Sequence, residues 1–343
     1  LDMAGISLKT KANGGEIVTS NGKLTGLIID KPMELIEEII PRYTESEKIK
    51  ALKTAEKICF ENGITTVDEA GLLKSDILLI DSLQKNNLFD LRVYAMVANE
   101  KKSLEYFFKN GSIKNDRLNV SSIKVYADGA LGSRGAALKD SYSDKNNHYG
   151  SIIISIDSIE KLAIKALAHD FQMNTHAIGD YANSEVLKIY NDVLSDKSDP
   201  RWRIEHAQVI SNEDFSKFNE KIIPSVQPLH ATSDMYWAEE RLGKSRIKGA
   251  YAYKDLLDWS GRLALGTDFP VEEVNPINTF YAAVSRKDLK QYPAGGYQYE
   301  NALSRREALL GMTIWGAYAN FEDSLKGSIS PGKYADFVIL DRD

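Results

Sequence analysis

Four residues whose side chains can bind a divalent metal stand at or near the ends of apolar runs. These are Lys124 in S-I-K-V-Y-A-D-G, His176 in M-N-T-H-A-I-G-D, His206 in R-I-E-H-A-Q and Asp268 in L-A-L-G-T-D-F-P. Neutral imidazole and carboxylate groups suit Zn²⁺, Fe²⁺ or Mn²⁺, and a metal held in this way can activate water. The spacing indicates half or more of a metallohydrolase site.

Each of these residues also has a purely structural explanation. A single histidine such as His176 could simply be packed at a strand end, and Asp268 could cap a turn in G-T-D. Two histidines at consecutive strand ends, with an aspartate at a third, favour metal binding instead. A carboxylate at Asp268 can bind metal through one oxygen and take a proton from water through the other.

Lys124 is the unusual member, because a lysine inside an apolar run buries an ammonium group at considerable cost. Burial lowers the pKa of an amine, and a neutral amine can add CO₂. The resulting carbamate would bridge two metals through its two oxygens. The alternative is that Lys124 pairs with Asp128 or another acid.

The elements that must position these residues alternate between strand and helix. We expect strands at 63–67, 91–97, 121–127, 172–176, 201–206, 222–226 and 262–267. We expect helices at 44–62, 73–85, 101–110, 158–171, 181–194, 212–219, 276–289 and 304–319. The strands are rich in Val, Ile and Leu without strict alternation, which indicates a parallel sheet covered by helices. Since barrel enzymes carry active groups at the carboxyl ends of their strands, we predict an α/β (β/α)8 TIM barrel that lacks its first strand.

The two ends of the chain differ from this pattern. Residues 14–30 predict a hairpin that turns at Asn21-Gly22, inserted before the helix that Thr44 caps and Gly63 ends. At the other end, A-D-F-V-I-L predicts a strand with no helix after it, as part of a second, small β unit. The chain begins with Leu1, so we expect a fragment, a processed chain or an incomplete sequence.

Composition limits the classes of function. Hydrophobic residues make up 43% and charged residues 27% of the 343 residues, a balance typical of globular proteins. The net charge of −6 is spread along the chain, so we expect no nucleic-acid partner. No apolar run approaches the roughly 20 residues of a membrane span. We expect a cytoplasmic protein, leave a homo-oligomer open, and interpret the single cysteine, Cys59, as a buried helix residue.

Several longer motifs carry a resemblance to a known family. The strings I-K-V-Y-A-D-G-A-L-G-S-R-G-A-A-L, T-H-A-I-G-D-Y-A-N, R-I-E-H-A-Q, Q-P-L-H-A-T-S-D, G-T-D-F-P-V and G-S-I-S-P-G-K-Y-A-D-F-V-I-L-D resemble the amidohydrolase superfamily. The similarity is greatest to its family 3, which includes N-substituted formamide deformylases, and runs from about residue 1 to 343. It implies a barrel over 1–325 and, over 326–343, the C-terminal strand of a composite β-sandwich.

The resemblance also implies a site with one or two divalent metals, Zn first, with Fe or Mn as alternatives. His176 and His206 would bind one metal, and a carbamate on Lys124 would bridge. Asp268 would bind the other metal and act as the base. That second metal should also use an H-x-H pair on strand one, and the sequence contains no H-x-H.

Three further residues are candidates for binding substrate. Asp128 and Arg134 lie in D-G-A-L-G-S-R-G, where glycines let the backbone approach a ligand and an arginine can bind a carboxylate or carbonyl. His230 follows the strand predicted at 222–226, which would be strand seven of a complete barrel; it could polarise a carbonyl, although a hydrogen-bonded loop histidine is the alternative.

These observations predict a metal-dependent hydrolase of the amidohydrolase type (EC 3.5) that cleaves a non-peptide C–N bond in a small amide, formamide or cyclic amide. One alternative is a catalytically incomplete barrel that serves as a binding or scaffold protein, or an inactive fragment. Another is a metal-dependent deaminase, which generally needs no bridging lysine; Lys124 argues against it.

Overall fold

A seven-stranded parallel sheet forms the centre of the molecule in the computed structural model, which describes residues 1–11 and 14–341. Its strands are β3 (Thr66–Leu72), β4 (Arg92–Ala98), β6 (Leu118–Tyr126), β7 (Gln172–Ala177), β8 (Trp202–His206), β9 (Ile222–Val226) and β10 (Ala264–Leu265). They are hydrogen-bonded side by side in chain order, and the short β5 (Ile113–Lys114) pairs antiparallel with β6. A strand is present at each of the seven predicted places, although β3 begins three residues later than the predicted 63–67 and β10 is only two residues long.

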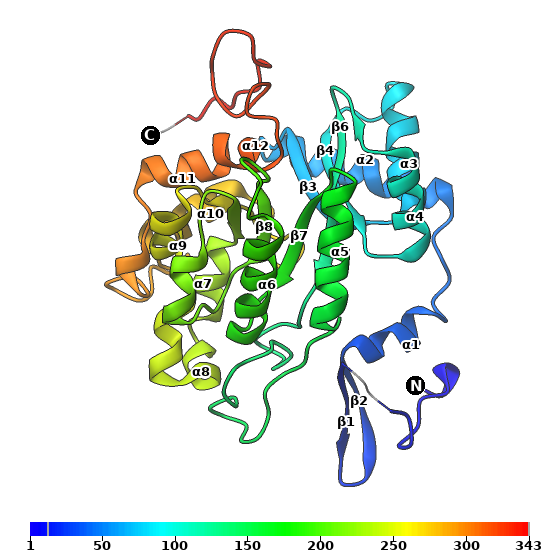
Figure 1. Ribbon diagram of the computed structural model, residues 1–343, viewed down its shortest axis with the longest axis vertical. Coiled ribbons are helices and arrows are strands. Elements are labelled where there is room, and N and C mark those ends of the chain that lie inside the picture. The colour runs from blue at the N-terminus through cyan, green and yellow to red at the C-terminus, as the bar shows by residue number, and fades with distance from the viewer. Residues whose placement is uncertain (12–13, 342–343) are drawn as a thin grey trace.

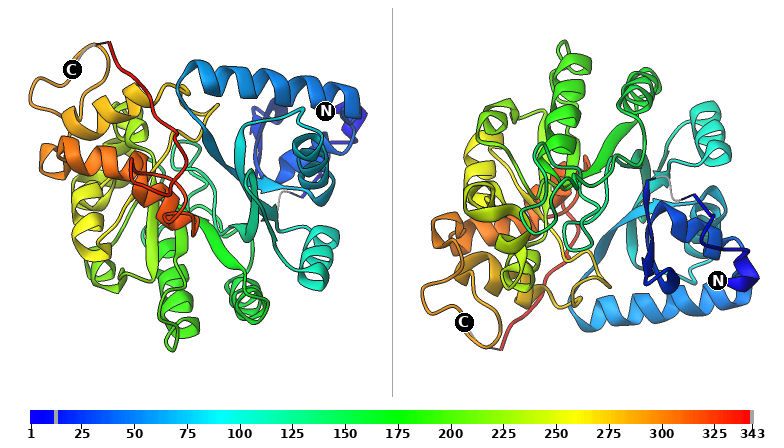
Figure 2. Two further views of the ribbon diagram at one scale, coloured as in Figure 1. Left: turned by 90° about the horizontal axis from the view of Figure 1, so that it is seen from above. Right: turned by 90° about the horizontal axis from the view of Figure 1, so that it is seen from below.

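Helices surround this sheet, as Figure 2 shows along two opposite directions. They are α2 (Glu45–Glu61), α3 (Lys74–Lys85), α4 (Lys101–Asn110), α5 (Ile156–Ala168), α6 (Asp180–Val193), α7 (Pro228–Asp234), α8 (Ala238–Arg246), α9 (Tyr253–Ser260), α10 (Pro276–Ser285), α11 (Arg305–Met312) and α12 (Ile314–Ala319). Every residue of β7 and β8 is buried, as expected for parallel strands covered on both faces.

The sheet curves into a partial barrel whose two edge strands are β3 and β10. Within residues 1–11 and 14–341, no ladder joins these two strands. The predicted barrel architecture is therefore confirmed as an open sheet of seven strands rather than a closed ring of eight. Parallel strands place their carboxyl ends at one edge, so the loops after β6, β7, β8, β9 and β10 lie together.

The predicted hairpin is present as β1 (Gly15–Ser20) and β2 (Lys23–Asp30), followed by the short α1 (Glu34–Glu37) (Figure 1). Asn21 and Gly22 both adopt positive φ, 50° and 71°, which the two-residue turn requires. The hairpin contacts the loop after β6, because Glu16 pairs with Lys145 at 3.2 Å.

The long helix that follows begins and ends as predicted. The Thr44 hydroxyl accepts from the Glu47 N–H, and the Glu47 carboxylate accepts from the Thr44 N–H, so two free amides at the helix start are satisfied. Gly63, with φ 72°, follows its end. Cys59 is buried on this helix, as expected.

Some predicted helices differ from the observed ones. Residues Asn212–Lys217 form a 3-10 helix, and the single helix predicted over 304–319 is broken at Thr313, whose φ is −129° and ψ −93°. The helix predicted to reach 289 ends at Ser285, because Arg286 adopts a left-handed φ of 55°. Helices α7, α8 and α9 were not predicted at all.

The strand predicted within A-D-F-V-I-L is not formed. Among the described residues no strand pairs with this segment, and its apolar side chains, Phe337, Val338, Ile339 and Leu340, are exposed. A strand requires a hydrogen-bonded neighbour for its backbone groups. The assignment of 326–343 to a β-sandwich stays a prediction. No helix in the described part of the chain has both the length and the apolar character needed to cross a membrane.

Candidate metal centre at the strand ends

The predicted ligands come from three neighbouring strands, β6, β7 and β8, and from the loop after β10, at one edge of the sheet. Lys124 lies in β6, His176 in β7 and His206 at the last position of β8. The ladder pairs Ala177 with His206, so the two histidines lie on neighbouring strands at nearly the same height. Asp268 lies three residues after β10, which completes the predicted set at this edge.

The imidazole rings of His176 and His206 lie 4.5 Å apart between centroids. Burial lowers the pKa of His176 well below its usual value and that of His206 to about 4. Both rings are therefore neutral near pH 7, which is the form that binds metal.

One nitrogen on each ring is free for a ligand. Nε2 of His176 is buried and has no hydrogen-bond partner among the described residues. Nδ1 of His206 contacts Oε1 of Gln227 at 2.7 Å. That oxygen only accepts, so Nδ1 carries the proton and Nε2 keeps its lone pair. A buried nitrogen without a partner is costly, and a divalent metal would satisfy it.

His206 and Asp268 both have strained backbones. Their φ angles are 74° and 57°, in the left-handed region that residues with a Cβ rarely adopt. Such conformations cost of order 1–3 kcal/mol each and cluster at functional sites. The surrounding fold holds both side chains at the strand ends despite this cost.

Asp268 lies close to a third histidine. One ligand atom from each of His206, His230 and Asp268 lies within 4.8 Å of the other two. Nε2 of His230 is 3.8 Å from Oδ2 of Asp268, and Nδ1 is 2.9 Å from Oε1 of Glu272. Burial opposes the charged ring, but these two carboxylates outweigh it and raise the pKa of His230 to about 9. Burial likewise opposes ionisation of Asp268, yet His230 and His206 hold its pKa below the usual value.

Lys124 is buried, with 4% of its surface exposed. Burial lowers the pKa of its amine, against the opposing effect of the Glu205 and Asp268 carboxylates. Nζ lies 4.7 Å from the centre of the Tyr126 ring. In the described ranges no carboxylate oxygen comes within 4.0 Å of this amine, so the alternative pairing with Asp128 is not formed.

Comparison with known proteins identifies the family. The amidohydrolase family model matches residues 1–343. The chain belongs to the amidohydrolase family. It is similar, at 33% identity over 358 residues, to the protein LONG AFTER FAR-RED 3 of Arabidopsis thaliana, with 99% of this chain and 61% of that protein covered. It is 24% identical over 232 residues to the N-substituted formamide deformylase of Arthrobacter pascens, covering 66% and 41%.

A solved structure supports the same assignment. An uncharacterized metal-dependent hydrolase from Pyrococcus horikoshii OT3 superposes with a TM-score of 0.83 at 27% identity, over 95% of this chain and 67% of that one. This amidohydrolase-family chain spans less than two thirds of the length of the two curated relatives above.

Asp128 holds the loop after β6 in this member of the amidohydrolase family. Its carboxylate is fully buried and accepts backbone N–H groups of Ala137, Ile178 and Gly179 at 2.8 to 3.0 Å. One oxygen lies 3.6 Å from Nε2 of His176. Burial raises the pKa of Asp128 to about 7. These contacts favour a positioning role, and its contact with substrate stays a prediction.

Arg134 is engaged with the protein. Its guanidinium binds Asp144 through two hydrogen bonds of 3.1 and 2.7 Å, and Arg241 contacts the same carboxylate. Its predicted contact with substrate is untested. The remaining histidines lie elsewhere: Nε2 of His148 contacts the carbonyl oxygen of Arg134 at 2.9 Å, and His169 packs on Phe108.

The sequence did not indicate the residues that support the ligands. Gln227 and Glu272 contact His206 and His230 from 21 and 42 residues away, so no local spacing marks them. Their only signal was proximity to predicted strand ends, in V-Q-P-L-H and D-F-P-V-E. They orient the imidazoles on which the proposed chemistry depends.

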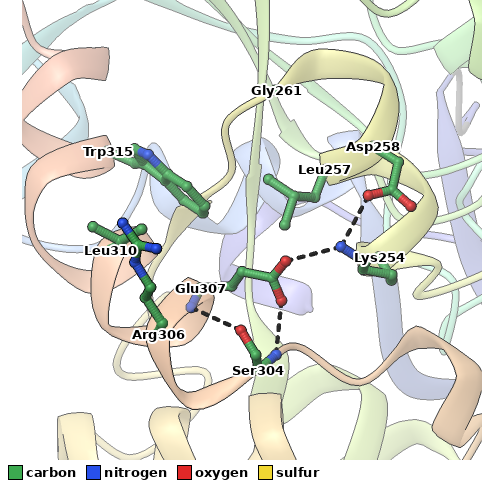
Figure 3. Close-up of a pocket in the computed structure, with 9 residues that line it drawn as sticks. All are labelled: Lys254, Leu257, Asp258, Gly261, Ser304, Arg306, Glu307, Leu310 and Trp315. Atoms are coloured by element: carbon green, nitrogen blue, oxygen red, sulfur yellow. Dashed lines mark hydrogen bonds and ion pairs between the residues drawn. The ribbon is translucent and has the colours of Figure 1, made fainter.

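A cavity of about 470 Å³ lies between α9 and α11, on the outer helical layer (Figure 3). Three of its four charged residues are paired with one another, because Lys254 contacts Asp258 at 2.9 Å and Glu307 at 2.8 Å; the fourth is Arg306. None of the residues that line it is a predicted ligand. This cavity is separate from the candidate metal centre.

Proposed function

We propose that this chain is a metal-dependent hydrolase that cleaves a non-peptide C–N bond in a small amide, formamide or cyclic amide. The observation that supports it most is the buried, unpartnered Nε2 of His176 beside the neutral ring of His206. Imidazole, carboxylate and a neutral amine form a donor set suited to one or two divalent ions, with Zn²⁺ first. When bound, the metal would lower the pKa of water and stabilise negative charge on the carbonyl oxygen.

Different residues of the chain would bind the metal and transfer the proton. His176 and His206 would hold the metal, together with Lys124, on which a carbamate would supply two oxygens. Asp268 stays ionised, and its side chain is 39% exposed, so its carboxylate can accept a proton from the attacking water. It would then pass the proton to the leaving nitrogen as the C–N bond breaks.

His230 would act on the substrate. Its raised pKa keeps the ring protonated near pH 7, so Nε2 can donate a hydrogen bond. A donor at this position would stabilise the oxygen of the carbonyl under attack. The relatives support the bond type in part, since one of them is an N-substituted formamide deformylase.

A second candidate function is metal binding without turnover. The open edge between β3 and β10 favours it, because in the described residues nothing closes the sheet beside Asp268. A deaminase is less favoured, because Lys124 lies buried with a lowered pKa, as a carbamate bridge requires.

The test is the substitution Asp268→Asn in zinc-supplemented protein, assayed on N-substituted amides, formamides and cyclic amides. We expect turnover by the wild type and its loss in Asp268→Asn, with most of the metal retained. Glu273→Gln, an exposed residue of the same loop, is the matched control and should keep activity. Full activity in Asp268→Asn contradicts the role of Asp268. Metal binding by an inactive wild type supports the second candidate, and ammonia release from aminated heterocycles alone supports a deaminase.

A further inference from the structure

Glu272 joins two of the loops that build the candidate site. It lies four residues after Asp268, in the loop that follows β10. Its Oε1 is 2.9 Å from Nδ1 of His230 and accepts a hydrogen bond from Oγ of Ser233 at 2.6 Å. His230 and Ser233 are one turn apart on α7, after β9. A single carboxylate oxygen therefore connects α7 to the loop that carries Asp268.

This contact determines how the His230 ring lies. The carboxylate of Glu272 accepts hydrogen bonds, so Nδ1 of His230 donates to it. The ring then directs its other nitrogen, Nε2, toward Asp268, with 3.8 Å between Nε2 and Oδ2. The side chains of His230 and Glu272 are 11% and 16% exposed, so water competes weakly for this bond. The Ser233 hydroxyl restricts Glu272 in turn.

We propose that Glu272 is a positioning residue of this site: it holds His230 so that Nε2 faces the carbonyl under attack, beside Asp268. The inference rests on the function proposed above. It requires only the geometry of the acceptor oxygen, so glutamine at this position should conserve much of the effect. Alanine leaves Nδ1 without its acceptor and frees the ring to rotate.

The chain offers a matched control. Glu273 is the next residue, is exposed, and accepts from Nδ2 of Asn278 at 3.1 Å rather than from an imidazole. Glu273→Ala removes the same chemical group from the same loop. Any general effect on the loop should appear in both variants.

The direct test is long-range ¹H–¹⁵N spectroscopy of ¹⁵N-histidine protein, zinc-free and zinc-loaded. The chain has five histidines, and His230→Gln identifies the His230 signals by their loss. We expect the signal of a hydrogen-bonded Nδ1 proton of His230 in the wild type, Glu272→Gln and Glu273→Ala, and the loss of that hydrogen-bonded signal in Glu272→Ala. Wild-type signals for His230 in Glu272→Ala, or equal changes in Glu273→Ala, would overturn the inference.

Turnover provides the second readout. We expect kcat to fall about 10- to 100-fold in Glu272→Ala, a loss typical of outer-shell partners, with a smaller change in KM and recovery in Glu272→Gln. A fall in thermal stability without a changed ring signal would indicate a merely structural role and overturn the inference. If the His230 signals change in Glu272→Ala but the wild type shows no turnover, hydrolysis is contradicted and the positioning contact is kept. If the wild type is active but the His230 signals do not change in Glu272→Ala, the positioning contact is contradicted and hydrolysis is kept.

Discussion

His206 donates from Nδ1 to Oε1 of Gln227 over 2.7 Å, and this contact decides which ring nitrogen is left for a metal. Gln227 is itself held, because its amide nitrogen donates to the carbonyl oxygen of Ser225 at 3.3 Å. Both side chains are buried, so the tautomer of His206 is fixed before any ligand arrives. Such fixed orientation is what an outer hydrogen bond contributes to a metal site.

Gln227→Leu should therefore weaken zinc binding. The ring of His206 would lose its acceptor, and we expect the dissociation constant for Zn²⁺ to rise about 10- to 100-fold. Competition with a chromophoric chelator measures this constant. Gln208→Leu is the control, since Gln208 is also buried but bonds to the hydroxyl of Tyr251 at 3.0 Å. Equal losses in both variants would contradict the role of Gln227.

Lys124 should take up CO₂. Its buried amine has a lowered pKa, and a neutral amine is the reactive form. We expect protein incubated with zinc and ¹³C-bicarbonate to show one carbamate signal that Lys124→Met lacks, and bicarbonate to increase metal uptake. Lys326 is also buried but is paired with Glu322 at 2.7 Å, so the signal should survive Lys326→Met. Metal uptake that does not change with bicarbonate concentration would exclude a carbamate bridge on Lys124.

Asp214 should stabilise the fold in a pH-dependent way. Its fully buried side chain pairs with Lys139 at 2.8 Å and Lys217 at 2.5 Å. Burial opposes ionisation, but the two lysines outweigh it and lower the pKa of Asp214 below its ordinary 3.8. The unfolded state therefore binds this proton more readily, and the stabilisation is present above pH 3.8 and lost as the pH falls through the folded pKa.

Asp214→Asn should thus lower the free energy of unfolding by about 1–3 kcal/mol near pH 7, measured with urea. The difference from the wild type should shrink below the unfolded pKa. Glu213→Gln is the control: Glu213 also contacts Lys139, at 2.9 Å, but is 67% exposed, and should change little. A difference that persists unchanged in acid would count against this account.

The sequence predicted the sheet well because buried parallel strands have a strong local signature. Runs such as those of β7 and β8 are apolar and bounded by turn residues. The strands lie in the sheet in the same order as in the sequence. The helices after β9 were missed because the signal there is weak: α8 contains Gly243 with φ 73°, and α7 is only seven residues long. The segment 335–340 has a strand's composition, but pairing depends on a partner that composition cannot supply.

The placement of the candidate ligands at the strand ends was predictable, whereas their hydrogen-bond partners were not. His176, His206 and Asp268 stand at strand ends, where residue type and position together suggest chemistry. Gln227 and Glu272 act through contacts made only when distant loops meet. Asp128 illustrates the same limit, since the three backbone N–H groups that its carboxylate accepts lie 9 to 51 residues away and no local spacing marks them.

The most direct test of the central claim is the metal content of the purified chain. After equilibrium dialysis against Zn²⁺, elemental analysis should find at least one zinc per wild-type chain and a large loss in His176→Ala/His206→Ala. The control is His148→Ala/His169→Ala, which removes two histidines outside the site and should keep the wild-type content. A wild type that binds no zinc, or a His176→Ala/His206→Ala variant that binds as much as the wild type, would contradict a metal centre at these strand ends.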